Sequence, residues 1–266
     1  MFVEERKNQI VYLRSDVIPA FHAFSTRFGG VSKGEFASMN FGAGRGDSID
    51  AVRENYRIWC GLFGVELGKC CVTQQVHEAS VKIVTSDDIY TTMEYVPYNA
   101  DGIVTAEKNL PIFCFTADCV PVLLWDADGR AIGAVHCGWK SSVKDILKNA
   151  VDAMESLGAK REKIRVALGP SIGKCCFETD RDVPDAIEKY LSGETDGIWV
   201  LREDGKYLVD LRLANKKRLL QLGIKEENID VSDECTVCSH DKYWSARYCA
   251  KNNLKRGSLS SGIILR

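Results

Sequence analysis

Cys119, His136 and His77 are the residues whose types point most directly to chemistry in this chain of 266 residues. Together they would supply one thiolate sulfur and two imidazole nitrogens with a vacant fourth position, which is how catalytic zinc is held. No short C-x-x-C or H-x-x-x-H pair links them, so a second interpretation stays open, in which Cys119 is a core thiol and the histidines are hydrogen-bonded at strand ends. A third is a metal-free hydrolase with Cys119 as nucleophile and His136 as base.

A predicted β-hairpin brings two of these residues together. The apolar segments 120–125 and 131–135 flank Asp126-Ala127-Asp128-Gly129, and Asp-Gly between apolar runs is a hairpin signal. If the chain folds back there, paired residues have numbers that sum to about 255–257, which places Cys119 within a residue or two of His136. Asp118 lies at the same open end, so a thiol, an imidazole and a carboxylate converge where loops begin.

The neighbouring segments predict further elements at this end. Residues 71–77 are strand-like and end at His77, and a turn at 99–102 presents Asp101 at the start of another strand. After the hairpin, apolar residues recur at helical spacing from Val143 to Leu157, which predicts one amphipathic helix capped by Ser141 and Ser142.

A glycine-rich stretch near the N-terminus carries an arginine. Arg27 precedes Gly29-Gly30, and such loops can cradle an anion or a sugar. The alternative is an ordinary turn with a solvated arginine.

The 11 cysteines include three short groupings. Cys235-x-x-Cys238 could be half of a zinc knuckle or a redox pair, but no second C-x-x-C exists, so we interpret both as buried thiols. The adjacent pairs Cys70-Cys71 and Cys175-Cys176 are interpreted as core thiols. Only four histidines are present, so any histidine-based site draws on His22, His77, His136 and His240.

Composition bounds the class of protein. A net charge of -2 argues against a nucleic-acid polymer or an anionic membrane as the main partner, while a local basic pocket for one phosphate remains compatible with it. Neither a signal peptide nor a membrane-spanning stretch is predicted, and we expect a cytoplasmic protein. Predicted hairpins outnumber βαβ units, so we expect a single domain over residues 1–266, α/β in class, with mixed, largely antiparallel sheets flanked by helices.

Seven ordered motifs resemble a known family. They are His22-Ala23-Phe24-Ser25-Thr26-Arg27 with Gly29-Gly30-Val31-Ser32, Ala37-Ser38-Met39-Asn40, Gln75-Val76-His77, Ala100-Asp101-Gly102, Thr116-Ala117-Asp118-Cys119-Val120-Pro121, His136-Cys137-Gly138-Trp139 and Leu168-Gly169-Pro170-Ser171-Ile172-Gly173. In order and spacing they are similar to the laccase-domain purine nucleoside phosphorylases, also known as multicopper polyphenol oxidase-like proteins, over nearly the whole chain.

The resemblance implies a cytosolic enzyme with zinc held by His77, Cys119 and His136. Its implied substrates are purine nucleosides such as adenosine, inosine, guanosine and methylthioadenosine, which are cleaved with phosphate, and adenosine is also deaminated. Given that chemistry, Arg27 could hold the phosphate as a bidentate fork, and Asn40 could bind a sugar hydroxyl or a base edge.

The resemblance adds Arg247, in the C-terminal motif, as a candidate for substrate binding. Either Asp101 or Asp118 could orient a metal-binding histidine or carry a proton. A monomer and a homodimer are both compatible with the sequence.

The chain departs from the family pattern in two places. Lys140 stands where the family usually has an arginine, so a single ammonium group replaces a guanidinium that could bind an anion through two nitrogens. The C-terminal motif becomes Tyr243-Trp244-Ser245-Ala246-Arg247-Tyr248-Cys249, and the family's following Thr-Gly-Arg is not recognisable in Lys255-Arg256-Gly257-Ser258.

Two further hypotheses compete with this one. Thiolate and imidazole ligands also suit copper, so a copper-dependent phenol oxidase is an alternative, weakened by the small number of histidines. A non-enzymatic role as a binding partner in a larger complex is the other, and turnover of any nucleoside would exclude it.

Overall fold

The computed structural model describes residues 1–89, 96 and 98–266. The strands are Phe2–Lys7 (β1), Ile10–Ser15 (β2), His22–Ser25 (β3), Val81–Ile83 (β4), Gly102–Thr105 (β5), Ile112–Thr116 (β6), Val120–Asp126 (β7), Ile132–Cys137 (β8), Ile164–Leu168 (β9), Glu178–Thr179 (β10), Trp199–Leu201 (β11), Tyr207–Val209 (β12), Ile229–Val231 (β13) and Leu259–Ile263 (β14). The α-helices are Ile49–Leu62 (α1), Trp139–Val143 (α2), Ile146–Ser156 (α3), Asp182–Tyr190 (α4), Leu211–Gln221 (α5) and Ala246–Lys251 (α6).

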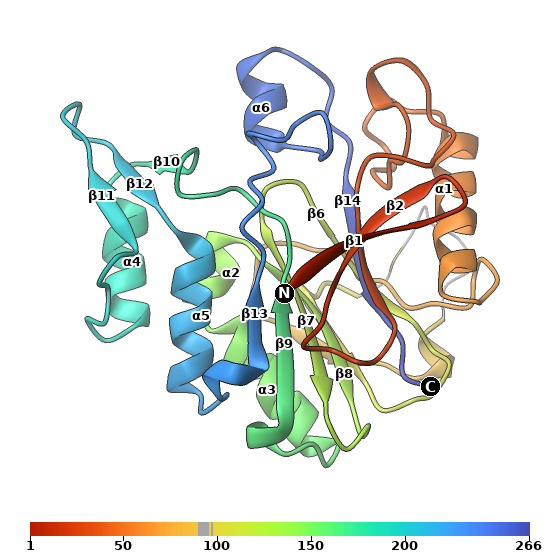
Figure 1. Ribbon diagram of the computed structural model, residues 1–266, viewed down its shortest axis with the longest axis horizontal. Helices are drawn as coiled ribbons and strands as arrows, with labels where there is room; N and C mark the ends of the chain where they lie inside the picture. The colour runs from red at the N-terminus through yellow and green to blue at the C-terminus, as the bar shows by residue number, and fades with distance from the viewer. Residues whose placement is uncertain (90–95, 97) are drawn as a thin grey trace.

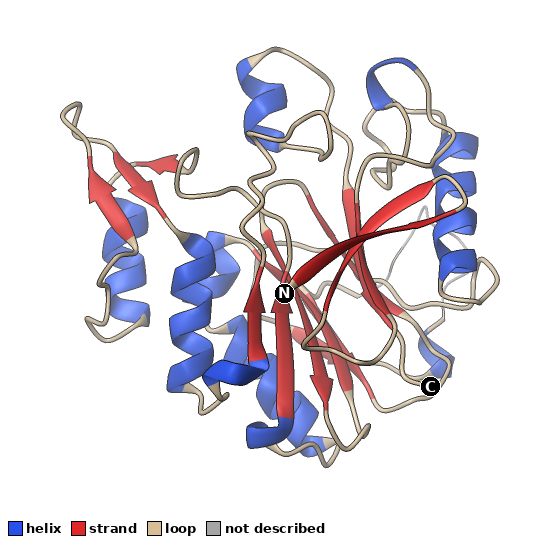
Figure 2. Ribbon diagram, in the orientation of Figure 1, coloured by secondary structure: helices blue, strands red, loops and turns tan. Residues whose placement is uncertain are grey.

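Two sheets pack face to face between two helical layers. One sheet has the strand order β1-β2-β3-β14-β6 and the other β13-β9-β7-β8-β5-β4, while a small sheet, β10-β12-β11, lies apart. Figures 1 and 2 show α1 on one side of the strands and α2, α3 and α5 on the other. Within the larger sheets only β4 with β5 and β13 with β9 pair in parallel. The predicted class, mixed α/β with largely antiparallel sheets, is confirmed.

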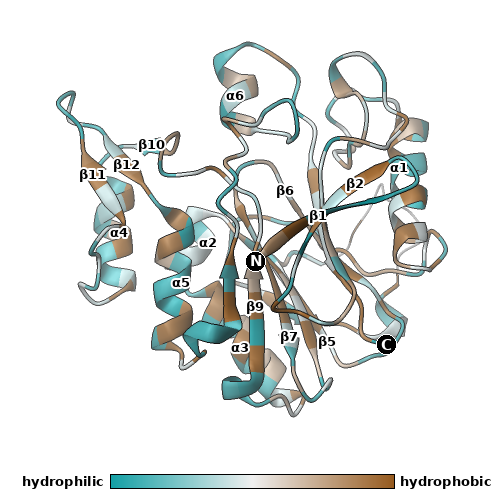
Figure 3. Cartoon of the chain, in the orientation of Figure 1, coloured by the Kyte–Doolittle hydropathy of each residue, from teal (hydrophilic) through white to brown (hydrophobic). Residues whose placement is uncertain are grey.

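Alternating side chains build the three apolar layers, as expected for strands covered on both faces. On β7, Leu123 faces the space between the two sheets, whereas its neighbours Val122 and Leu124 face the helices α2 to α5. On β6, Phe113 points the other way, towards α1. Figure 3 accordingly colours β5 and β7 mostly brown.

The central hairpin forms in the predicted register. Val120 pairs with Cys137 and Pro121 with His136, so Cys119 lies two positions from the partner of His136. The tight turn contains Gly129 with a positive φ of 68°, a conformation that glycine adopts without steric cost.

The helix expected after the hairpin is divided, which corrects the prediction of one element capped by Ser141 and Ser142. Both serines lie inside α2, and Asp145 interrupts the helical path with a φ of 70°. Its carboxylate is bound by the guanidinium of Arg218 on α5, at 2.8 Å from Nε and 2.5 Å from Nη2. This tertiary ion pair accounts for a break that helical periodicity cannot reveal.

The segment 71–77 is also not a continuous strand. Only isolated bridges form, from Cys71 to Ile112 and from Gln74 to Asn99. The chain then turns at His77, which has a φ of 61°. Within the described residues, no helix is both long and apolar enough to cross a membrane.

Candidate active site

His77, Cys119 and His136 come together at the open end of the hairpin. Their ligand atoms all lie within 4.8 Å of one another. Cys119 Sγ is 4.0 Å from His77 Nε2, and the two imidazole rings meet edge to face with centroids 4.8 Å apart. Two imidazoles and one thiolate with a free coordination position form a donor set that suits zinc, so these residues could hold a metal ion.

A single carboxylate holds both histidine segments in place. Asp101 Oδ1 accepts hydrogen bonds from His136 Nδ1 at 2.8 Å and from the backbone amide of His77 at 2.9 Å. Its Oδ2 accepts from the amides of Val76 and Glu78 at 3.0 and 2.9 Å. Because Asp101 binds Nδ1, His136 Nε2 is the nitrogen left to bind a metal ion, as in a histidine ligand supported by a carboxylate. Of the two aspartates predicted for this role, it is Asp101 that contacts a histidine.

The electrostatics of the site favour an ionised thiol. Burial alone would raise the pKa of Cys119, but His136 and His77 lower it to about 6. Burial alone would lower the pKa of His136, but the Cys119 sulfur and the Asp101 carboxylate raise it to about 9. The thiolate is the form that binds metals and acts as a nucleophile.

Gly138 leaves room for the three ligands. A Cβ built at this position would lie 3.0 Å from His77 Cδ2 and 3.2 Å from Cys119 Sγ. Gly138 also stands at the N-cap of α2. Any larger residue would therefore crowd the group of His77, Cys119 and His136.

Asp118 has a different task from Asp101. Its backbone has a φ of 88°, and its carboxylate accepts from Thr236 Oγ1 at 2.7 Å and from the Arg247 amide at 2.6 Å. The residue thus ties the loop before Cys119 to the C-terminal segment.

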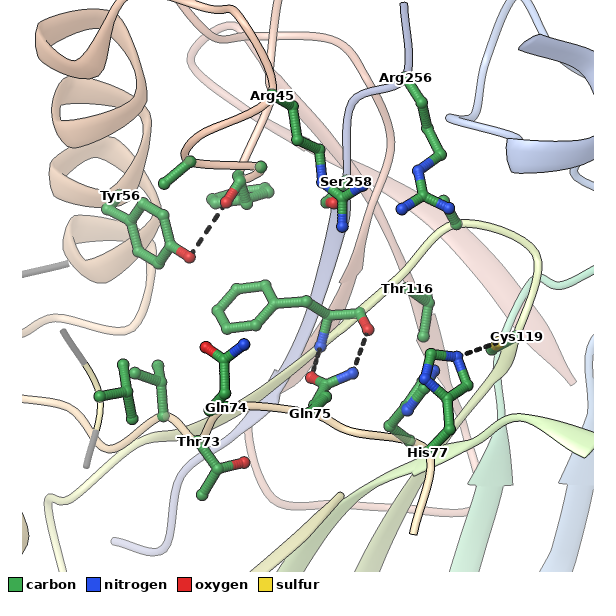
Figure 4. A pocket seen from close by; sticks show the side chains of 18 residues that line it. Arg45, Tyr56, Thr73, Gln74, Gln75, His77, Thr116, Cys119, Arg256 and Ser258 are labelled. Atoms are coloured by element: carbon green, nitrogen blue, oxygen red, sulfur yellow. Dashed lines mark hydrogen bonds between the residues drawn. The ribbon is translucent and has the colours of Figure 1, made fainter. Parts of the chain in front are cut away.

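Two cavities meet at this group. The first has a volume of about 260 Å³, and the second, on the side of Trp139 and Phe177, about 360 Å³. Both are lined by His77, Cys119 and Arg256. Figure 4 shows the first cavity with Arg45 and Arg256 on one side and Gln74 and His77 on the other.

Arg45 and Arg256 are residues that sequence reasoning missed. Within the described part of the chain, no carboxylate pairs with either guanidinium. The burial of Arg45, reinforced by the positive charge of Arg256, lowers the pKa of its guanidinium, so the two cations are close enough to repel. Two neighbouring cations without a counter-ion form a site for an anion. The available signal was Gly42-Ala43-Gly44-Arg45-Gly46, a glycine-rich loop with an arginine like the one that drew attention to Arg27.

Comparison with known proteins agrees with these motifs. The model of the family described as multi-copper polyphenol oxidoreductase laccase matches residues 21–266. This chain belongs to that family. The laccase-like resemblance predicted from the motifs is confirmed.

Three known proteins illustrate what this chain is similar to. A purine nucleoside phosphorylase of Bacteroides thetaiotaomicron is 30% identical over 251 residues, which cover 92% of this chain and 91% of that protein. Adenosine deaminase RL5, from an unknown prokaryotic organism, is 30% identical over 242 residues, 89% of this chain and 92% of its own. The crystal structure of YlmD from Geobacillus stearothermophilus has a TM-score of 0.90 at 28% identity and covers 99% of this chain and 98% of that one.

Arg27, predicted from the laccase-family motifs to hold phosphate, lies away from both cavities. Its guanidinium donates to the carbonyls of Ala37 and His240 and stacks over Trp244 at 3.8 Å. It lines a separate hollow of about 90 Å³. The guanidinium nitrogens that were expected to bind phosphate therefore already donate to backbone carbonyls.

Asn40, predicted to bind a sugar hydroxyl or base edge, is fully buried. Its Oδ1 accepts from the amides of Gly42 and Ser258, and its Nδ2 donates to Asp47. Its polar atoms are directed at the protein and not at a cavity.

Arg247, predicted to bind substrate, lines the second cavity. Two of its nitrogens donate to the carbonyls of Cys176 and Glu178, at 3.2 and 3.0 Å. Lys140, at the family's arginine position, is exposed on α2.

Proposed function

We propose that this protein is a zinc-dependent purine nucleoside phosphorylase that also deaminates adenosine. The observation that carries the proposal is the position of the unpaired Arg45 and Arg256 in the same cavity as the His77, Cys119 and His136 group, all within the described part of the chain. A metal-binding group beside an anion site suits a neutral nucleoside together with phosphate. Relatives named purine nucleoside phosphorylase and adenosine deaminase add weight to it.

His77, Cys119 and His136 would hold the zinc. When bound, zinc in such a site supplies Lewis-acid polarisation and lowers the pKa of a coordinated water. Asp101 keeps the His136 ring oriented through Nδ1, and its three backbone hydrogen bonds keep the turn at His77 in place.

Arg45 and Arg256 would bind the phosphate. In phosphorolysis a phosphate oxygen forms a bond to C1′ of the ribose while the C1′–N9 bond breaks, and the base leaves with the electron pair and takes up a proton. The two guanidiniums position the dianion for this attack and offset its charge. In deamination water adds at C6 of adenosine and ammonia leaves, so inosine forms without phosphate.

The purine would lie in the first cavity. Phe41, Tyr56 and Phe115 form an aromatic cluster in its wall, with Tyr56 and Phe115 centroids 5.5 Å apart. The Gln75 amide fixes Phe115 by bonding both its backbone nitrogen and its carbonyl, at 2.7 and 2.6 Å. Among the described residues, the Gln74 side-chain amide has no hydrogen-bond partner, so it can bind a purine edge.

A multicopper oxidase is disfavoured despite the family's description. A blue-copper site plus a trinuclear cluster uses many more imidazole ligands than the two histidines gathered here. Both nitrogens of His22 are occupied, by the Ser15 amide and the Ala20 carbonyl. His240 stacks on Tyr248.

One observation favours a second candidate function. Cys119, His136 and Asp101 are arranged as a nucleophile, a base and an orienting carboxylate, and the low pKa of the thiol fits a metal-free cysteine hydrolase. Such an enzyme would stay active after chelation and lose activity on alkylation of Cys119.

The test is a product assay on metal-quantified protein given adenosine with and without phosphate, beside His77→Ala. Phosphate-dependent release of adenine and ribose-1-phosphate, with loss of both metal and activity in the variant, would support the proposal. If inosine is the only product and its formation does not depend on phosphate, the protein is an adenosine deaminase and not a phosphorylase. Activity that survives complete removal of metal would instead support the metal-free cysteine hydrolase.

A further inference from the structure

A second group of cysteines lies outside the site described above. Cys175, Cys176, Cys235 and Cys238 come from the loop after β9 and the loop after β13, and their sulfurs all lie within 4.8 Å of one another. Cys175 and Cys238 are exposed and Cys176 is half-buried. The interpretation of Cys175 and Cys238 as buried thiols is therefore wrong, whereas Cys235 is buried as expected. Packing does not explain exposed thiols that converge.

The spacing of the sulfurs fits a tetrahedral ion. Cys238 Sγ is 3.6 Å from Cys175 Sγ and 3.5 Å from Cys176 Sγ. Zinc–sulfur bonds of roughly 2.3 Å place tetrahedral sulfurs about 3.8 Å apart. A disulfide needs a separation of about 2.05 Å, so these pairs are not bonded as they stand.

Backbone amides are already directed at one sulfur. The Gly173 amide donates to Cys235 Sγ at 3.2 Å, and the amides of Val237 and Cys238 face the same sulfur from within the C-x-x-C turn. Donors aimed at a sulfur stabilise its thiolate, as outer-shell hydrogen bonds do around metal ligands.

The loop geometry keeps the four sulfurs close. A Cβ built on Gly173 would lie 3.1 Å from Cys235 Cβ and 3.2 Å from Cys175 Sγ. Ser171 forms a parallel bridge with Cys235, and the Thr236 amide donates to the Ser171 carbonyl at 3.0 Å. The two loops are thus held side by side before any ion binds.

We propose that Cys175, Cys176, Cys235 and Cys238 bind a structural zinc ion. Four thiolates fill the tetrahedral coordination sphere of zinc, so no position remains for water or substrate and the ion has a structural role. Arg247 and Lys251 line the hollow beside the cluster and supply positive charge next to the thiolates.

The ion would fasten segments that reach the active site. Arg247 donates to the carbonyl of Cys176, and Thr236, next to Cys235, donates to Asp118, the neighbour of Cys119. The proposed function does not depend on this ion, and the ion does not depend on it.

The test separates the two metal sites. Full-length His77→Ala/Cys119→Ala protein, purified under reducing conditions, should retain about one zinc per chain, because its four-cysteine group is intact. Adding Cys175→Ser and Cys238→Ser should remove this zinc, and Cys249→Ser, which alters a buried thiol outside both groups, should not. Cobalt in place of zinc should give the charge-transfer bands of a tetrathiolate site.

A second measurement uses the unmodified chain in case a variant does not fold. Alkylation located by mass spectrometry should spare Cys175 and Cys238 until a strong chelator is added, although both are exposed. Equal alkylation with and without chelator, a disulfide between these cysteines in the purified protein, bound iron instead of zinc, or zinc that survives both serine substitutions would each overturn the proposal.

Discussion

Asn40 Oδ1 accepts a hydrogen bond from the backbone amide of Ser258 at 2.9 Å, joining two segments that are 218 residues apart in the chain. The same oxygen accepts from the Gly42 amide at 2.8 Å. Arg45 follows Gly42 by three positions and Arg256 precedes Ser258 by two. One buried amide therefore connects the two segments that carry the arginines of the proposed phosphate site.

Asn40→Ala is expected to loosen this site without touching the metal ligands. It leaves the buried backbone amides of Gly42 and Ser258 without their acceptor, which should cost about 2–5 kcal/mol of unfolding free energy. The Asp47 carboxylate loses one donor but keeps that of Ser32. In the folded fraction the KM for phosphate should rise at least about tenfold, with metal content unchanged, because the arginines lose their fixed spacing. Steady-state kinetics and metal analysis check it, and an unaltered KM for phosphate would contradict a positioning role.

Arg45→Gln and Arg256→Gln should each weaken phosphate binding. Loss of one charge-assisted contact is expected to cost about 1.5–3 kcal/mol, or roughly 10- to 150-fold in KM for phosphate. Deamination of adenosine, which uses no phosphate, should change less in Arg45→Gln. The matched control is Arg181→Gln, an exposed arginine on the surface beside α4, which should behave as the parent protein. Equal effects on both reactions would place Arg45 elsewhere in the mechanism.

Asp101→Asn should lower affinity for the metal held by His77, Cys119 and His136. In the parent protein Asp101 Oδ2 accepts from the backbone amides of Val76 and Glu78. The amide nitrogen of an asparagine in that position cannot accept a hydrogen bond, so the turn that carries His77 loses this support. A loss of about 10- to 100-fold in metal affinity is expected, measured by competition with a chelator. Asp118→Asn is the comparison, because that carboxylate contacts Thr236 and Arg247 and, among the residues that the structure describes, no histidine. Similar losses in both variants would mean that Asp101 has no special part in holding the metal.

The hairpin and the proximity of Cys119 to His136 could be predicted from the sequence because their signals are local. Asp-Gly between two apolar runs set the register, and the register placed Cys119 near His136. His77 was linked to them through ligand chemistry and through the family motifs, since pairing geometry did not reach it. The carboxylate at Asp101 was identified only as one of two candidates, because which aspartate faces a histidine depends on the turn of the backbone at His77.

The remaining site depends on contacts between distant segments. Nothing local shows that Asn40 bonds the chain at Ser258, or that Arg27 is occupied by Trp244 and two carbonyls while Arg45 is free of ion pairs among the described residues. The four-cysteine group was missed for the same reason. Cys175-Cys176 and Cys235-x-x-Cys238 each look incomplete alone, and only the pairing of their loops makes a set of four.

His22 is a buried histidine that should make stability depend on pH. Its Nε2 accepts from the Ser15 amide and its Nδ1 donates to the Ala20 carbonyl, both at 2.8 Å, so the ring is neutral in the fold. Burial lowers its pKa from 6.5 to about 4. Because the unfolded chain binds the proton more readily, the stability that His22 contributes is fully present above about pH 6.5 and is lost as pH falls towards 4.

The prediction is that His22→Gln flattens this dependence. The parent protein should lose about 2 kcal/mol of unfolding free energy between about pH 7.5 and pH 5 through His22 alone. Glutamine can accept from the Ser15 amide but has no proton to gain, so the variant should be less stable at pH 7.5 and should lose less on acidification. Urea unfolding of both proteins at the two pH values gives the difference, in which metal-site contributions common to both cancel. If the difference in unfolding free energy between the parent and the variant is the same at both pH values, the pKa of His22 does not differ between the folded and unfolded states.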